Sequence, residues 1–553
     1  MKKTIAIILA LVLCLGVLAA CGNSEQAATS SGGSSESSGS SSSSSGSSSG
    51  SGSSGSSSAP ADTGDDGDED EDEEEEMAEI NVALMCFAPM DQNATGPVAD
   101  AINEIIEPAI NVHANISWFD AATYGTQIPM QIQAGEKLDV IMFTPVPGSS
   151  YVSYRSANQL MDISDLIDEY GPDVKARLGD LLLGTSYGDA VYGITHYNSK
   201  SGHETMYVRK DLADASGVTA DLENAKSWSD MKAAFEVMTA DTGLPAVVNT
   251  DAEGTVLFPI PFMIDGDSFS DAFWYDAAGD GYNLIMIDES TDTVRCYYET
   301  EYYDKMCEMV ADWYKSGLVY KDAATAQDYS DTLVKSGVGY AEIRAAELGS
   351  KESSEAITGY ELVEIQITPS KVGTNGCTKF GYGIPVTSDD PEAAMKYLNY
   401  LYTEEGAEVV NILTWGLPGR DWVVGDDGMA TYPDGVSADS VQYHTGDFLY
   451  GDQIKVIPWE GSDPNLRAMQ QAEMDNAPIS KYMGFTLSTE GMENTATALN
   501  MVLQKYKPAL ASGSAPDWQA TLAAFRDELK ANGIDDLLAA YQAQLDAWLA
   551  DNG

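Results

Sequence analysis

The sequence predicts an α/β protein whose folded part contains two lobes. Residues 80–87 and 138–143 form short apolar runs, and residues 112–119 alternate between apolar and polar side chains. Helix-period segments separate these three runs, and a strand–helix–strand–helix–strand order with short connections indicates right-handed crossovers in a parallel sheet. The stretch from residue 77 to residue 553 is also far longer than one hydrophobic core usually supports. We therefore expect two lobes.

The first helix is expected to begin near Pro97, because the first turn of a helix tolerates proline, and its apolar residues recur at helical spacing as far as Ile110. A second helix is expected over residues 123–134. Ligands of parallel α/β sheets bind outside the carboxyl ends of the strands. This rule points to the loops after Phe87 and after Phe143 as parts of a binding site.

Further elements follow along the chain. A helix over residues 302–316 is expected to end at Gly317, a favourable residue just beyond a helix. Residues 381–385 are expected to be a strand, and Asp390 and Pro391 then mark a helix start as cap and first residue. Helices are also expected over residues 228–240, 518–531 and 534–550.

The N-terminus has the pattern of a bacterial lipoprotein signal. Lys2 and Lys3 precede an apolar run over residues 5–18, and small residues lead to Cys21. We expect a signal peptide over residues 1–20 and acylation of Cys21, which would hold the protein at the outer face of the cytoplasmic membrane. The alternative, an uncleaved membrane anchor, is less consistent with a run shorter than the roughly 20 residues of a spanning helix.

Residues 21–76 are predicted to be a disordered tether. Most of this stretch is Ser and Gly, which offer too little apolar surface to offset the entropy of ordering. Its last part, residues 65–76, is a run of Asp and Glu whose like charges repel and stay solvated. Calcium capture by this run is disfavoured, because it lacks the turn Gly and closing Glu of an EF-hand loop.

Composition narrows the possible partners. The formal net charge of −58 argues against binding to nucleic acid or to anionic lipid headgroups, which require clustered Lys and Arg. Neither a CxxC pair nor an HExxH motif occurs, so we expect no metal or cofactor, and a metal shared by His196 and His203 is disfavoured. A disulfide between Cys296 and Cys307 and buried free thiols remain alternative states of the cysteines, which also include Cys86 and Cys377.

Several segments, taken in order, resemble the extracellular solute-binding proteins of ABC importers, in particular the family 1 sugar-binding lipoproteins. The segments that carry the resemblance are residues 135–140 (GEKLDV), 161–166 (MDISDL), 191–197 (VYGITHY), 206–212 (MYVRKDL), 227–231 (SWSDM), 335–343 (KSGVGYAEI), 390–398 (DPEAAMKYL) and 411–417 (NILTWGL). Each is weak alone, and their order over residues 80–548 makes the match specific. The C-terminal region resembles the ending found on gut-type Firmicute lipoproteins of this family.

The resemblance implies a periplasmic-binding-protein-like fold of two α/β lobes with hinge crossings and a helical C-terminal region. The lobe boundaries that follow are 77–200 and 369–403 for lobe 1, and 201–368 and 404–553 for lobe 2, the last with the helical extension. It also implies a monomer that closes on a small polar solute, most plausibly an oligosaccharide, and delivers it to the permease subunits of an ABC transporter. Two departures weaken residue-by-residue transfer: Ile194 and Thr195 replace a usual proline, and a frequent Gly-Pro-Trp is absent after residue 343.

Candidate ligand-binding residues are taken from the expected loops and crossings and from aromatic and acidic side chains, which suit the C–H faces and hydroxyls of sugars. They are Asp91, Thr144, Tyr197, His203, Trp274, Glu342 and Trp415. For the two tryptophans a role as core anchors is the alternative, and for Asp91 and Glu342 it is a solvated acid. His203 could instead line a hinge.

Other functions remain open. A surface glycoside hydrolase would need two carboxylates flanking a cleft, and the number of acids does not exclude it. An adhesin would more often show β-sandwich repeats or a wall-anchoring tail, and neither is visible. A peptide or an amino-sugar ligand is an alternative to an oligosaccharide within the same fold. The order of the solute-binding segments favours a binding protein that is not an enzyme.

Overall fold

The structure is a computed structural model that contains no ligand, metal or partner chain. It describes residues 76–87, 90, 92–146, 148–251, 262–264, 266–274, 276–278, 284–489 and 491–552. The expected signal peptide, the acylated Cys21 and nearly all of the tether lie outside these residues. Within the described residues, no helix combines the length and the apolar character needed to cross a bilayer.

The first sheet has the order β2-β1-β3-β14-β6. Strand β1 (Ala78–Cys86) lies between β2 (Val112–Asp120) and β3 (Val140–Phe143) and is parallel to both, as the sequence predicts. Strand β14 (Gly381–Gly383) joins the sheet antiparallel to β3 and then pairs with β6 (Ile194–Thr195).

The helices around this sheet begin and end at recognisable signals. Helix α3 (Ala121–Ala134) is capped by Asp120, which accepts a hydrogen bond from the Thr123 amide at 3.1 Å, and it ends at Gly135 with φ +77°. Asp390 caps α14 (Pro391–Tyr400) in the same way, through the Ala393 amide at 2.9 Å, which confirms the predicted helix start.

Helix α2 (Gln92–Ile110) differs from its expected start. It begins five residues before Pro97, although proline forfeits one helical hydrogen bond. Ala94 and Thr95 are buried, so the face that packs on the sheet continues upstream of the proline. Burial of that extra turn offsets the missing bond.

The remaining elements of this half of the molecule are short. They are α4 (Tyr151–Ser156), α5 (Ser164–Tyr170), α6 (Pro172–Leu178), η2 (Gly179–Thr185), β4 (Ser186–Tyr187), β5 (Ala190–Val191), α13 (Thr374–Thr378), α15 (Ala407–Trp415), β15 (Val423–Val424), β16 (Ala430–Thr431), η6 (Gln453–Lys455) and α16 (Leu466–Asn476).

The second sheet is antiparallel, with β7 (His203–Arg209) between β12 (Ala341–Ala346) and β13 (Leu362–Gln366). Around it lie α7 (Lys210–Ser216), α8 (Thr219–Glu223), α9 (Trp228–Thr242), β8 (Phe262–Ile264), η4 (Phe269–Asp271), β9 (Ala272–Trp274), β10 (Ile285–Asp288), β11 (Thr293–Cys296), η5 (Tyr297–Glu299), α10 (Glu301–Lys315), α11 (Ser330–Ser336) and α12 (Ser350–Thr358). Gly317 follows α10 with φ +77°, the backbone conformation expected of it.

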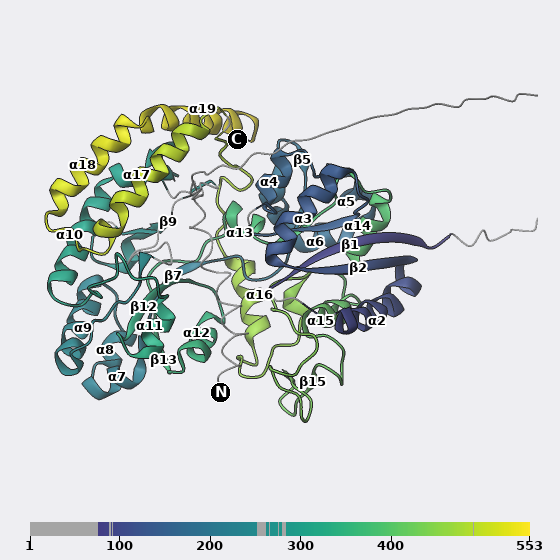
Figure 1. Ribbon diagram of the computed structural model, residues 1–553, viewed down its shortest axis with the longest axis horizontal. Helices are drawn as coiled ribbons and strands as arrows, with labels where there is room; N and C mark the ends of the chain where they lie inside the picture. Colours follow the sequence, from purple (N-terminus) through teal and green to yellow (C-terminus); the bar gives the residue numbers. More distant parts are fainter. Residues whose placement is uncertain are drawn as a thin grey trace, which may run out of the picture. The chain divides into compact units, whose positions relative to one another are not determined.

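Three C-terminal helices complete the second half. Helices α17 (Glu493–Ala511), α18 (Trp518–Ala531) and α19 (Ile534–Asn552) contribute Leu499, Phe525 and Leu545 to the same core as the second sheet. Figure 1 shows α17 and α18, in yellow-green and yellow, next to α10. The described residues therefore form two main cores, one around each sheet.

One expected boundary is wrong. Residues from Val409 to Val456 belong to the core of the first sheet, whereas the expectation placed 404–553 with the second lobe. Helix α15 explains this: all its residues from Val409 to Trp415 are buried, and the helix packs on α2. A helix that is mostly apolar carries no local signal for which of two cores will bury it.

The four cysteines of the folded part are all buried. Cys307 and Cys377 are buried free thiols, so no disulfide links Cys296 to Cys307. Burial raises the pKa of the Cys307 thiol to about 12, which keeps it protonated and unreactive.

Candidate functional site

Three connecting segments run between the two cores and lie against one another. The first joins β6 to β7, the second joins β13 to α13, and the third follows α16. Backbone bridges pair Gly202 with Lys371 and Val372 with Ile479, so the first segment contacts the second and the second contacts the third. A side chain on these segments is positioned by both halves of the molecule.

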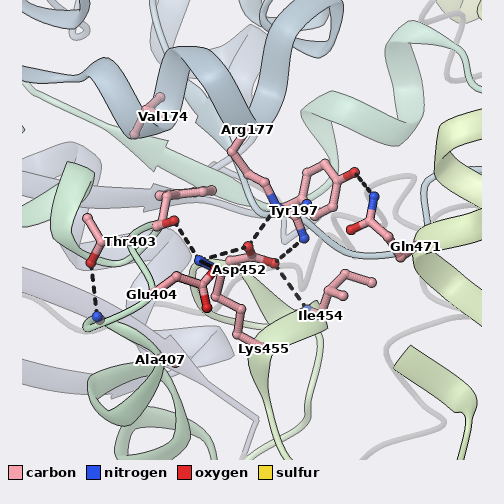
Figure 2. A network of polar contacts seen from close by, with 12 residues as sticks. Val174, Arg177, Tyr197, Thr403, Glu404, Ala407, Asp452, Ile454, Lys455 and Gln471 are labelled. Carbon is pink, nitrogen blue, oxygen red and sulfur yellow. Dashed lines mark hydrogen bonds and ion pairs between the residues drawn. The ribbon is translucent and has the colours of Figure 1, made fainter. Parts of the chain in front are cut away.

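The beginning of the first connecting segment is held by a buried ion pair (Figure 2). Arg177 of α6 donates to both carboxylate oxygens of Asp452, at 2.7 and 3.2 Å, and Asp452 is fully buried. The Arg177 guanidinium also lies 3.8 Å from the centre of the Tyr197 ring. The Tyr197 hydroxyl accepts a hydrogen bond of 3.2 Å from Gln471 of α16. Each polar group here has a partner.

The charges of this network are closely balanced. Burial raises the pKa of Asp452, and the hydrogen bonds and charge of Arg177 oppose that rise. Lys455 adds a second cation 4.0 Å from Asp452 and also lies 3.0 Å from the exposed Glu404. The arrangement suits a structural anchor, because both buried charges are compensated.

The rest of this segment and the start of β7 contain buried polar atoms without hydrogen-bond partners. Asn198, Ser201 and Glu204 each have a buried side-chain oxygen without a hydrogen-bond partner. Desolvation raises the pKa of Glu204 to about 8, so its carboxyl group is largely protonated at neutral pH. Buried polar atoms without partners are uncommon in native proteins and often mark functional positions. Both ring nitrogens of His196, the neighbour of Tyr197, also lack partners, so unpartnered groups lie on either side of the ion-pair network.

Five charged side chains gather beside these groups: Lys200, Glu347, Lys379, Asp447 and Glu473, which together we call the charged recess. Glu347 lies one residue beyond β12, and the four other side chains all influence its pKa. Lys200 comes from the first connecting segment, Lys379 from the end of α13, Asp447 from a loop of the first core and Glu473 from α16. Glu347 is exposed to solvent, but desolvation raises its pKa. The Glu347 carboxyl group is therefore close enough to surrounding protein for its ionised form to be disfavoured.

An aromatic group adjoins the charged recess. Phe448, the neighbour of Asp447, packs against Phe87 and Phe380 with ring centres 5.7 and 5.6 Å apart. Phe87 follows β1, and Phe87 and Phe448 are both partly exposed. Partly exposed aromatic faces beside polar side chains are the combination that sugar rings require.

Of the residues predicted from sequence, Tyr197 lies on the first connecting segment and His203 is the first residue of β7, which follows it. Tyr197 is part of the ion-pair network described above. His203 is buried, with its Nδ1 3.2 Å from the Ser370 hydroxyl, and desolvation lowers its pKa while Glu473 opposes this. His203 therefore borders the charged recess and the second connecting segment at once.

Two other predicted residues are buried with their polar atoms bonded within the chain. Thr144 shares a hydrogen bond of 2.7 Å with Ser149. Glu342 accepts hydrogen bonds from Ser330 at 2.5 Å and from Arg344 at 3.3 Å. The structure does not bring these side chains to the charged recess.

The two tryptophans and Asp91 have different outcomes. Trp415 is buried, donates from Nε1 to the Ile457 carbonyl at 2.9 Å and packs against His444 and Trp459, as a core anchor does. Trp274 lies in β9, but its side chain is outside the described part, as is all of Asp91.

Sequence reasoning missed the charged recess. Lys200 and Glu347 each follow a predicted site residue by a few positions. The sequence analysis chose those earlier residues, Tyr197 and Glu342, instead. Phe87 ends the strand whose following loop the sequence did indicate, so its position was available from the strand rule. Nothing local marks Lys379, Asp447 or Glu473, which come close only through tertiary structure. Within the described residues, no group of three or more His, Cys, Asp or Glu side chains is arranged to hold a metal ion.

The comparisons with known proteins identify the family. Residues 95–408 match the family described as bacterial extracellular solute-binding protein, so the chain belongs to that family. Residues 481–550, which contain the three C-terminal helices, match a domain of unknown function, DUF3502. The family consists of binding proteins rather than enzymes, which decides against the hydrolase alternative.

Individual relatives extend this match. A carbohydrate ABC transporter substrate-binding protein of Streptococcus pneumoniae is 21% identical over 456 residues, which cover 81% of this chain and 87% of the relative. The crystal structure of the N-glycan transport solute-binding protein NgtS from the same organism has a TM-score of 0.71 at 17% identity, covering 86% of this chain and all of NgtS. NgtS in complex with Man5GlcNAc has a TM-score of 0.59 at 17% identity, covering 86% of this chain and 99% of NgtS.

Proposed function

We propose that this protein is a lipid-anchored extracellular receptor that captures an oligosaccharide between its two halves and delivers it to the permease of an ABC transporter. The observation that carries the proposal is the charged recess, where side chains from both cores and from the first connecting segment meet beside partly exposed phenylalanines. In a family of solute-binding proteins, such a position between two cores suits a ligand that contacts both halves.

An oligosaccharide fits this chemistry better than a peptide does. Carboxylates, lysines and buried unpartnered oxygens can bond to many hydroxyl groups, and Phe87 and Phe448 offer flat apolar surface for the C–H faces of sugar rings. The relatives named above also favour sugars, since one is a carbohydrate-binding component and another is complexed with Man5GlcNAc.

The lipid anchor and the permease partner rest on sequence. The pattern that ends at Cys21 supports acylation, and the residues 21–76 support a flexible tether between lipid and folded part. Wild-type protein should fractionate with membranes and carry lipid on Cys21 by mass spectrometry, whereas Cys21→Ala should release it into the medium. Equal membrane retention of both forms would contradict the anchor.

The ligand class can be tested by melting the purified folded part with a panel of oligosaccharides and peptides. A ligand that binds only the folded state raises the midpoint, by an amount equivalent to about 2.7 kcal/mol at a concentration of 100 times its Kd. We expect midpoint increases with oligosaccharides and none with peptides. Increases with peptides alone would favour the peptide-binding alternative.

A further inference from the structure

Two lysines in the charged recess lack a bonded partner and interact with Glu347 only through their charge. Of the 27 lysines and arginines in the described part of the chain, Lys200 and Lys379 alone are partly buried without any ion pair, hydrogen bond or ring contact of the charged group. Acids outnumber bases 87 to 29 in the sequence, so carboxylates are plentiful. Partly buried lysines normally acquire one of these carboxylates, because an uncompensated buried charge is costly.

The two lysines belong to segments that pack directly on each other. Lys379 follows α13, and Gly376 of that helix approaches the Lys200 backbone so closely that an added Cβ would lie 3.1 Å from the Lys200 carbonyl oxygen. Burial lowers the pKa of Lys200 to about 8, Cys377 and Glu347 oppose that shift, and the charge of Lys379 adds to it. The two lysine charges therefore disfavour each other, and an anion bound by both would relieve that repulsion.

The acids of the charged recess do not compensate these cations fully. Asp447 is already paired with Arg467 at 2.6 Å, and Glu473 accepts a hydrogen bond of 2.8 Å from Ser199. Burial raises the pKa of Glu347, which favours its neutral form. Neither lysine lies within 4 Å of any of these carboxylates.

On these grounds we propose that Lys200 and Lys379 form an anion subsite that binds the carboxylate of an acidic sugar, such as a uronic or sialic acid, within the captured oligosaccharide. The inference rests on the proposed function and adds the substrate class. One carboxylate can accept a hydrogen bond from each ammonium group, while Asp447, Glu473 and the aromatic side chains contact the neighbouring neutral sugars.

The test compares matched ligands by titration calorimetry at pH 7. Sialyllactose and trigalacturonate are each measured beside their carboxyl-reduced, neutral forms, with Man5GlcNAc as a further neutral glycan. We expect at least one acidic glycan to bind tenfold or more tightly than its reduced form. Lys200→Met and Lys379→Met should each weaken that binding about tenfold and leave the reduced form unaffected, because only the charge-assisted bond is lost.

Two controls keep folding and charge effects apart. Lys321→Met removes an exposed lysine without a partner and should not change the affinity for the acidic glycan. Lys379→Arg keeps the charge and should bind better than Lys379→Met, and melting of each variant verifies folding.

Neutral glycans that bind as tightly as the acidic ones, or lysine variants without effect, would overturn the anion subsite and leave the proposed oligosaccharide receptor intact. If none of the five glycans binds, both proposals fail.

Discussion

The two ends of the first connecting segment use buried polar groups in opposite ways. At Tyr197, the ion pair between Arg177 and Asp452 satisfies its charges within the chain. Only a few residues further on, the Lys200 ammonium group has no ion pair, and Glu204 of β7 has an oxygen without a partner. The first arrangement fixes where the segment begins. The second leaves polar groups that a bound ligand can compensate, which is typical of a binding site.

The largest expected effect is a loss of folding stability when the ion pair between Arg177 and Asp452 is broken. Arg177→Met leaves Asp452 buried without its main counter-ion, and removing one partner of a buried pair typically costs about 3–5 kcal/mol. Chemical denaturation should show a loss in this range. Removing both charges with Arg177→Met and Asp452→Asn together should cost clearly less than the single change. A single variant within 1 kcal/mol of wild type would show that the pair does not anchor the segment.

The next effect concerns the buried carboxyl group of Glu204, whose contribution to folding stability depends on pH. The pKa of Glu204 is about 8 in the folded state and near 4.5 when exposed, so the folded state binds the extra proton. The stability that this proton contributes is fully present below about pH 4.5 and is lost as the pH rises through 8. Glu204→Gln lacks this loss and should gain about 2–3 kcal/mol relative to wild type between pH 5 and pH 8.

Denaturation at both pH values measures this difference. Glu405→Gln, a change at an exposed acid, is the matched control and should show no such trend. A parallel pH dependence of the Glu204 variant and wild type would mean that Glu204 is ionised without penalty.

A smaller effect is expected on ligand binding. Because burial lowers the pKa of Lys200 to about 8, the side chain loses its charge above that pH. The other groups that influence its pKa are Cys377, Glu347 and Lys379. Affinity for an acidic glycan should fall about tenfold between pH 7 and pH 9, as one proton is lost from the free protein. The Lys200→Met variant should show a nearly flat profile, and an equally steep one would assign the titration to another group.

The smallest effect is expected at Tyr197. Tyr197→Phe removes a hydrogen bond of 3.2 Å from Gln471 but keeps the ring beneath Arg177. The loss of unfolding free energy should be about 0.5–1 kcal/mol. Tyr197→Ala, which also removes the ring, should cost more in the same denaturation experiment. Equal losses would indicate that the cation–π contact contributes nothing.

Local patterns in the sequence predicted much of the first sheet. The apolar run that became β1, the alternation that became β2 and the Asp390 cap of α14 each act over a few residues, so a linear reading suffices. Of the candidate site residues, Tyr197 lies on the first connecting segment and His203 begins β7, near the crossing that the family resemblance indicated for both. Thr144 and Glu342 lie close to the expected loops, but their burial depends on neighbours such as Ser149 and Ser330 rather than on their own type.

The sequence by itself determined the alternation of strands and helices, the capped helix ends and the order of segments that defines the family. Only the tertiary structure decided which core buries α15, and which charged groups meet. Arg177 and Asp452 are 275 positions apart, and Lys200 and Lys379 come together through two separate connecting segments. Secondary structure follows local periodicity and backbone hydrogen bonding, whereas the pairing of charges depends on packing between distant segments, which no local pattern encodes.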